Sequence, residues 1–215
     1  MKWHDLSDVC TYDRAAHTMS FRRAFLLLLL LIGSATFVLA GPKSVPKVAD
    51  LSVAGIKLVD AKSSRVVLGR EISSSTDPAL IEDDTEMPHA FATNKAGTEV
   101  LTLYFHYGGE VMAFSEFKVS LKSESKLTSK PIKLAGIANF VTGKGIKLGL
   151  SKAQLIKILG PPQESSSAGG AVILDYRIKD KEAGELLGYP AYLYYGKYTF
   201  KAGKLTEFRF GFEYP

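Results

Sequence analysis

The stretch YLYYGKYTFKAGKLTEFRFGFEY, residues 192–214, decides the fold of this chain. It contains two runs of alternating apolar and polar residues, 192–201 and 205–214, separated by a turn at Ala202-Gly203. Alternation of period two puts successive side chains on opposite faces of a strand, so we predict an antiparallel hairpin. Four alternate residues on one face of its second strand are aromatic, and we expect them to lie in the core: Phe208, Phe210, Phe212 and Tyr214.

A short helix is predicted upstream, from Lys152 to Leu159. Ser151 and Gln154 have the spacing of a capping box, in which each side chain binds the backbone amide of the other residue. The apolar residues recur at helical spacing, so one face should be buried. We expect Gly160 to end the helix in a left-handed conformation, because the Pro161-Pro162 pair that follows cannot continue it.

The sequence patterns that predict the other strands are less regular. Residues 99–107 and 111–121 are predicted to pair around Gly108-Gly109, with Phe117 and Val119 facing inward. A strand is expected over 172–178, after a flexible loop at 165–170. Residues 51–72 are interpreted as two strands around a turn at Lys62-Ser63-Ser64, and a helix from Asp60 to Leu68 is the competing interpretation. Residues 73–90 are predicted to be a polar loop.

These elements predict an α+β fold, with an antiparallel sheet and one well-marked helix. We divide the chain into a leader at 1–40, a β-rich part at 41–130 and an α+β unit at 131–215. Gly-Ile-Lys-Leu occurs at both 55–58 and 145–148, and Leu-Gly at both 68–69 and 159–160. Ser115-Glu116-Phe117 and Thr206-Glu207-Phe208 have a similar separation of about 90 residues, which raises the hypothesis of an internal duplication.

The helix and its surroundings also resemble a known family. The segment Gly149-Leu150-Ser151-Lys152-Ala153-Gln154-Leu155, with Leu159-Gly160-Pro161-Pro162 after it, is similar to the SmpA/OmlA (BamE) group of small envelope proteins. The hairpin at 198–205 matches the one that follows in that group, and the β-lactamase inhibitory protein is similar in architecture, with two such units. The resemblance implies a BamE-like fold for residues 143–215 and a non-catalytic role in the cell envelope. Its lipid-anchored members carry a cysteine that is missing here.

The N-terminal segment has the three parts of a secretory signal peptide. Arg22 and Arg23 precede an apolar run that includes Leu26 to Leu31, and Val38 and Ala40 are suited to the −3 and −1 positions of a cleavage site. The competing interpretation is an uncleaved anchor, but the run from Ala24 to Ala40 is shorter than the roughly 20 residues that a spanning helix needs. We expect cleavage near Ala40 and a periplasmic or secreted protein, with Met19 as an alternative start.

Composition narrows the function classes. The one cysteine, Cys10, precedes the apolar run, and Gly41 follows the expected cleavage site, so neither a disulfide nor a lipid anchor is expected in the mature chain. The formal net charge of +5 is spread along the sequence without a basic block, which argues against a nucleic-acid partner. We expect no cofactor. A protein partner in the envelope or outside the cell is the prediction.

The sequence shows no catalytic set. There is no Gly-x-Ser-x-Gly turn, and His89 and His106 are the only histidines after the leader. The acidic residues Glu82 to Glu86, with His89, lack the spacing of a calcium loop, so no metal site is predicted. Glu207 and Glu213 would lie about 20 Å apart on one strand, which does not suit a paired-carboxylate glycosidase.

The polar face of the C-terminal hairpin is the candidate binding surface. Tyrosine and arginine dominate protein-binding hot spots, and both residue types occur there. We therefore predict a non-catalytic module that binds a protein through this open sheet face. Inhibition of a secreted hydrolase and an enzyme with an unrecognised site are the alternatives. The candidate partner-binding residues are Tyr195, Lys197, Thr199, Glu207, Arg209 and Glu213.

Overall fold

The structure is a computed structural model, and it describes residues 47–213 apart from 73–78, 84–85, 106–112 and 180–192. The chain divides into two units, Met1–Lys43 and Ser44–Pro215, and every described residue belongs to the second. The predicted leader therefore lies outside the described residues. Among the residues that are described, no helix combines the length and the apolar character needed to cross a membrane.

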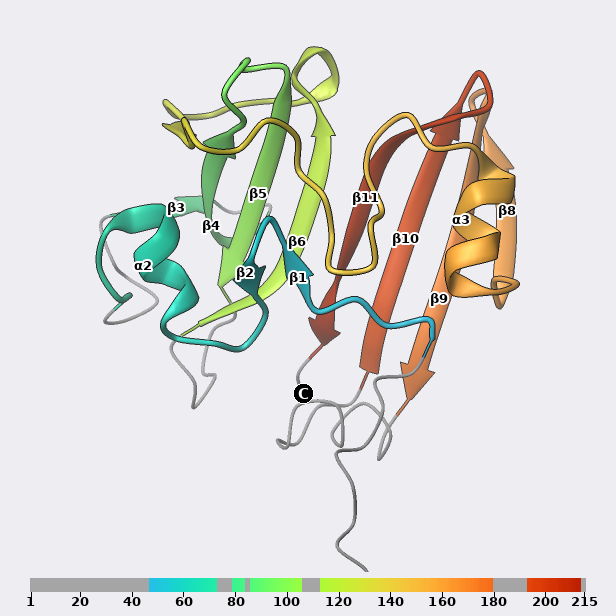
Figure 1. Cartoon of the computed structure of the whole chain (residues 1–215), viewed down its shortest axis with the longest axis horizontal. Coiled ribbons are helices and arrows are strands. Elements are labelled where there is room, and N and C mark those ends of the chain that lie inside the picture. The colour runs from blue at the N-terminus through green and yellow to red at the C-terminus, as the bar shows by residue number, and fades with distance from the viewer. Residues whose placement is uncertain (1–46, 73–78, 84–85, 106–112, 180–192, 214–215) are drawn as a thin grey trace, which may run out of the picture. The chain divides into compact units, whose positions relative to one another are not determined.

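The second unit is built on one mainly antiparallel sheet (Figure 1). Its strand order is β3-β4-β5-β6-β11-β10-β9-β8, and β7 (Ile132–Lys133) pairs parallel with β4. A separate hairpin joins β1 (Ser52–Val53) to β2 (Ile56–Lys57). The main strands are β3 (Ile81–Asp83), β4 (Glu86–Thr93), β5 (Glu99–Phe105), β6 (Phe114–Leu121), β8 (Glu164–Ala168), β9 (Ala171–Lys179), β10 (Leu193–Lys201) and β11 (Lys204–Glu213).

The order of elements repeats. Helix α2 (Ser63–Leu68) precedes the antiparallel strands β3 to β6, and helix α3 (Lys152–Leu159) precedes the antiparallel strands β8 to β11. The last strands of the two halves pair antiparallel, with Phe117 opposite Phe210. This repeated topology supports the predicted duplication, and the repeated sequence pairs fall at equivalent places: Gly69 and Gly160 each follow a helix, and Glu116 and Glu207 lie on the two paired strands.

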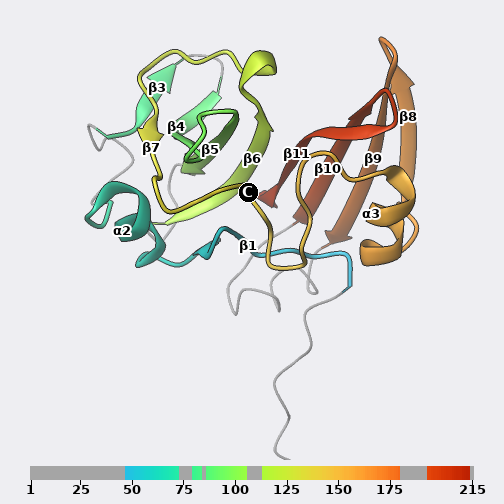
Figure 2. The same ribbon diagram turned by 45° about the horizontal axis from the view of Figure 1, so that its top comes forward.

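One face of the sheet is covered and carries the core. Figures 1 and 2 show both helices, the β1–β2 hairpin and the segment before α3 on the same side of the sheet. Leu155 and Leu159 of α3 are buried there. The predicted aromatic face is buried as expected, since Phe208 and Phe210 are 0% exposed and Phe212 is 1% exposed. Tyr214 lies outside the described residues.

Several local predictions are confirmed. Helix α3 has the predicted bounds, and its capping box is complete: Gln154 N donates to Ser151 Oγ at 3.3 Å and Ser151 N donates to Gln154 Oε1 at 2.8 Å. Strands β10 and β11 pair across Ala202-Gly203, and β5 pairs antiparallel with β6. Phe117 and Val119 are fully buried. The turn predicted at Gly108-Gly109 lies outside the described residues.

The prediction of a left-handed Gly160 is wrong in detail. Its φ of 89° is positive, but its ψ of −173° places it in an extended region that only glycine adopts readily. Tyr176 helps to hold this ending, because its hydroxyl donates to the Gly160 carbonyl at 2.9 Å. Glycine is thus required here for an extended exit from the helix.

The predicted turn at Lys62-Ser63-Ser64 is also wrong, and the competing helix is present as α2. Its two serines are buried and satisfied: Ser63 Oγ accepts from Lys57 N at 2.8 Å, and Ser64 Oγ donates to the Ala61 carbonyl at 2.7 Å. These contacts satisfy both hydroxyls inside the fold, where an unpaired hydroxyl would be costly. The sequence pattern alone favoured a turn because it ignores these contacts.

Two predicted loops contain strands. Residues 81–83 and 86–90, inside the loop predicted at 73–90, belong to β3 and β4. Most of the flexible loop predicted at 165–170 is β8, and only Gly169-Gly170 forms the turn into β9. Strand β8 lacks the apolar pattern that usually predicts a strand, and it forms by pairing with β9.

Candidate functional site

The face of the sheet opposite the core is the candidate site, and we call it the open face. Strand register places its residues in continuous rows. One row runs from Arg177 through Tyr195, Gly211 and Glu116 to Tyr104. The next row runs through Asp175, Lys197, Arg209, Lys118 and Thr102. Residues from both halves of the chain thus meet at the β6–β11 pair.

A hydrogen-bonded cluster crosses this pair of strands. The Tyr195 hydroxyl, on β10, donates to Glu116 Oε2, on β6. Arg209 Nε, on β11 between them, donates to the Tyr195 hydroxyl at 3.2 Å and forms an ion pair with Glu116 Oε1. Glu116 is only 2% exposed, so its carboxylate is compensated by charge-assisted contacts rather than by water.

Two aromatic rings extend the cluster. The guanidinium carbon of Arg209 lies 4.6 Å from the centroid of the Tyr104 ring, which is a cation–π distance. Lys197 Nζ lies 6.0 Å from the centroid of the Tyr195 ring. Tyr104 is fully buried and Tyr195 is 7% exposed, whereas Lys197 is exposed. The two buried tyrosine rings therefore form a rigid platform, and the cationic side chains of Arg209 and Lys197 lie against it.

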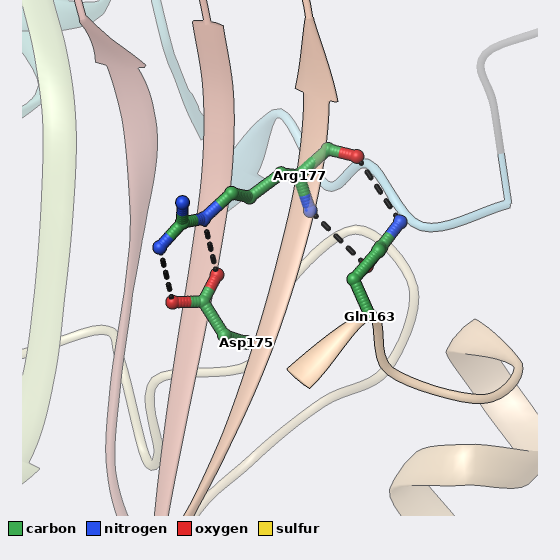
Figure 3. Close-up of polar contacts among 3 residues, drawn as sticks. All are labelled: Gln163, Asp175 and Arg177. Atoms are coloured by element: carbon green, nitrogen blue, oxygen red, sulfur yellow. Dashed lines mark hydrogen bonds and ion pairs between the residues drawn. The ribbon is translucent and has the colours of Figure 1, made fainter. Parts of the chain in front are cut away.

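A second polar group lies on β9, next to the edge strand β8 (Figure 3). Arg177 binds Asp175 in a bidentate manner, through Nε and Oδ1 and through a terminal nitrogen and Oδ2, both at 3.1 Å. The Gln163 side-chain amide binds the backbone of Arg177 at both its amide and its carbonyl. Gln163 precedes β8, and its side-chain amide bonds to β9 as a strand backbone would. These two bonds hold the Arg177 backbone in place.

The six predicted partner-binding residues all lie on the open face, but they differ in what they offer. Lys197 and Glu213 are exposed, and Thr199, Glu207 and Arg209 are partly exposed. Tyr195 is buried in the cluster, so its ring supports the surface more than it contributes contact area. Glu116, Asp175 and Arg177 also belong to this face and were not among the predicted residues. Alternation along 114–121 and 171–179 would have assigned them to the polar faces of their strands, but not to one site.

His89, the described histidine among the residues weighed for catalysis, is buried within the sheet. His89 lies on β4, 1% exposed, and its Nδ1 is 2.8 Å from the Met87 carbonyl. It therefore does not lie in the loop with which the sequence grouped it. Within the described part of the chain, no cluster of three or more His, Cys, Asp or Glu side chains could hold a metal ion. His106 lies outside the described residues.

Comparisons with known proteins identify a structural likeness but no matching family. No family model matches the chain, and no curated protein sequence matches it. Among solved structures, it is similar to a DUF4309 family protein, YjgB, from Bacillus subtilis subsp. subtilis strain 168. The two share 12% sequence identity, with a TM-score of 0.37, over 74% of this chain and 84% of that chain. A likeness at this level carries no functional argument.

Proposed function

We propose that this chain is an exported, non-catalytic module that binds a protein partner through the open face of β6, β11, β10 and β9. The observation that carries the proposal is the cluster of Tyr195, Glu116 and Arg209. It holds an arginine and a tyrosine in fixed positions on the side of the sheet that the helices do not cover. Such preorganisation lowers the entropic cost of binding.

The surroundings of the cluster suit a protein surface. Lys197, Lys179 and Glu213 are exposed, and Arg177 is held by Asp175 with its side chain 38% exposed. Charges of both signs are thus arranged around a buried centre. Arg209, whose side chain is 32% exposed, offers a hot-spot residue type at this centre, and the charged residues around it would form a polar rim.

The finer proposal is that the C-terminal unit is BamE-like and that the whole unit resembles the β-lactamase inhibitory protein in architecture. The capped helix followed by a glycine stop and a hairpin supports the first part. The repeated order of one helix and four antiparallel strands supports the second. Export rests on the signal-peptide pattern at 21–40.

Site-specific photo-crosslinking in the producing cells tests the proposal. A photoreactive amino acid replaces Thr199 on the open face in one variant and Val66 on α2 in another. Val66 is 60% exposed, so it is a control position on the surface away from the face. We expect the Thr199 variant, and not the Val66 variant, to yield one defined protein adduct in the envelope or culture fraction. Adding Lys197→Glu should remove the adduct.

Adducts of equal yield at both positions, or none at Thr199, would contradict the proposal. If the partner is a secreted hydrolase, its activity in the presence of the purified chain separates inhibition from simple association. Turnover of a substrate by the chain alone, abolished by a substitution on the open face, would establish the enzyme alternative instead.

A further inference from the structure

The open face also contains a pocket, which includes Glu207 of the predicted partner-binding residues and otherwise lies outside the cluster that carries the protein-binding proposal. It has a volume of about 300 Å³, at the lower end of the range for small-molecule sites. Its floor is formed by side chains of β4, β5, β6 and β11, and one wall is formed by residues 124–128, which follow β6. The two halves of the chain both contribute, because Glu207 lies on β11 and the rest on earlier elements.

Three polar side chains in the floor of the pocket are almost fully buried. His89 and Ser120 are each 1% exposed, and Thr102 is 2% exposed. The Met87 carbonyl can only accept a hydrogen bond, so His89 Nδ1 must carry the proton at 2.8 Å from it. In the neutral ring, Nε2 is then an acceptor. Buried polar groups of this kind are expensive to place in a fold unless they are satisfied.

The wall is tied to the floor and to the neighbouring hairpin. Ser125 Oγ lies 2.8 Å from Ser120 Oγ and donates to the Leu121 carbonyl at 2.9 Å. Glu124 forms an ion pair with Lys201 of β10 at 2.8 Å, which neutralises its charge. The pocket is therefore held open by contacts that involve its own lining residues.

The remaining groups define what the pocket can recognise. Lys118 and Lys126 supply donors, Glu207 supplies acceptors, and the Thr128 hydroxyl can act as either. Phe91 supplies an aromatic ring, packed edge-to-face on His89 with ring centroids 4.9 Å apart. A ligand that fits must be small and must present donors and acceptors on its edges, with an apolar face for the ring.

We propose that this pocket binds a saccharide of one or two rings. A pyranose carries hydroxyl groups that both donate and accept around its rim, and its C–H faces pack on aromatic rings. A simple anion would leave Glu207 in repulsive contact, and a simple cation would do the same with Lys126. The proposal goes beyond protein binding and does not depend on it.

The test uses the purified full chain. It is screened on an array of mono- and disaccharides that includes glucose, N-acetylglucosamine, maltose, cellobiose and galacturonate, and each hit is measured by isothermal titration calorimetry. We expect at least one sugar to bind with a Kd of about 1 mM or lower. Binding should also shift the side-chain ¹⁵N resonance of His89 in the NMR spectrum.

Variants link binding to the pocket. Lys126→Glu and Glu207→Gln should each weaken binding at least about tenfold. Lys130→Glu makes the same charge change at an exposed position outside the lining, and it should leave the Kd within about twofold. The proposal is overturned if no sugar binds at 10 mM, if amino acids such as glutamate bind and sugars do not, or if the pocket variants bind as the parent does.

Discussion

Gly211 lies directly opposite Glu116 where β11 pairs with β6, and there is no room for a side chain at this position. A Cβ at Gly211 would lie 2.5 Å from the Ser115 carbonyl oxygen and 2.6 Å from Glu116 Cα. Only glycine therefore lets β6 approach here, where the two halves of the chain meet. The close approach also allows the Glu116 side chain to reach across β11 to Tyr195 on β10.

Gly211→Ala tests this relationship. The added methyl group would collide with backbone atoms that cannot move without disturbing the β6–β11 ladder, so we expect a loss of stability of about 1–3 kcal/mol. Urea unfolding followed by circular dichroism measures the loss. Gly136→Ala is the matched control, because a Cβ there meets no atom within 4 Å and should change stability little. Equal midpoints for the two variants would show that β6 is free to shift.

The Glu116 carboxylate should be the energetic centre of the cluster. Glu116→Gln removes the charge that compensates Arg209 while keeping the shape, and we expect it to lower the free energy of unfolding by about 1–3 kcal/mol. Tyr195→Phe should cost less, since it removes one hydroxyl. In a double-mutant cycle, the combined variant should lose less than the two single losses added together. Strict additivity would mean that the two side chains do not interact in solution.

Glu99 provides a prediction on pH. Its side chain is 8% exposed and accepts from Phe140 N at 2.7 Å. Burial raises its pKa above the ordinary value of 4.5, against the opposing effects of this hydrogen bond and of Lys147. Folding thus favours the protonated form. Its contribution to stability is complete below pH 4.5 and is lost as pH rises through the raised pKa of the folded state.

Glu99→Gln keeps an acceptor for Phe140 without the titration. Between pH 4 and pH 7, the variant should gain stability relative to the parent, and its thermal unfolding midpoint should change less than that of the parent over the same interval. Calorimetry at several pH values in a single ionic strength measures this. Parallel pH profiles for parent and variant would assign the titration to another group.

Local sequence signals predicted the elements that local physics determines. The capping box around Ser151 and the alternation along 205–213 each predict the element that is observed, because capping and periodicity act within a few residues. Strand β8, with the sequence Glu-Ser-Ser-Ser-Ala, exists through pairing such as that of Ser166 with Ile173. The cluster was missed for the same reason. Glu116 and Tyr195 meet only once the β6–β11 register is known, and no pattern within either strand encodes that register.

Three core tyrosines should resist ionisation in alkaline solution. Burial raises the pKa of Tyr176 to about 12 and raises those of Tyr194 and Tyr198 further above their ordinary value of 10. Tyr194 is held by Asp50, whose backbone amide donates to the hydroxyl at 2.7 Å and whose carbonyl accepts from it at 3.0 Å. The unfolded chain loses these protons near pH 10, so stability should fall as pH rises above that value.

Absorbance at 295 nm follows this titration. We expect the ordinary tyrosines to ionise first, and the core tyrosines to ionise only together with loss of the circular dichroism signal. Tyr198→Phe is the informative variant, because the Tyr198 hydroxyl is buried and has no hydrogen-bond partner within the described residues. Removing it should keep or raise stability at pH 7 and should shift the alkaline unfolding midpoint upward. Ionisation of all the tyrosines near pH 10 in the folded protein would contradict the burial of these three core tyrosines.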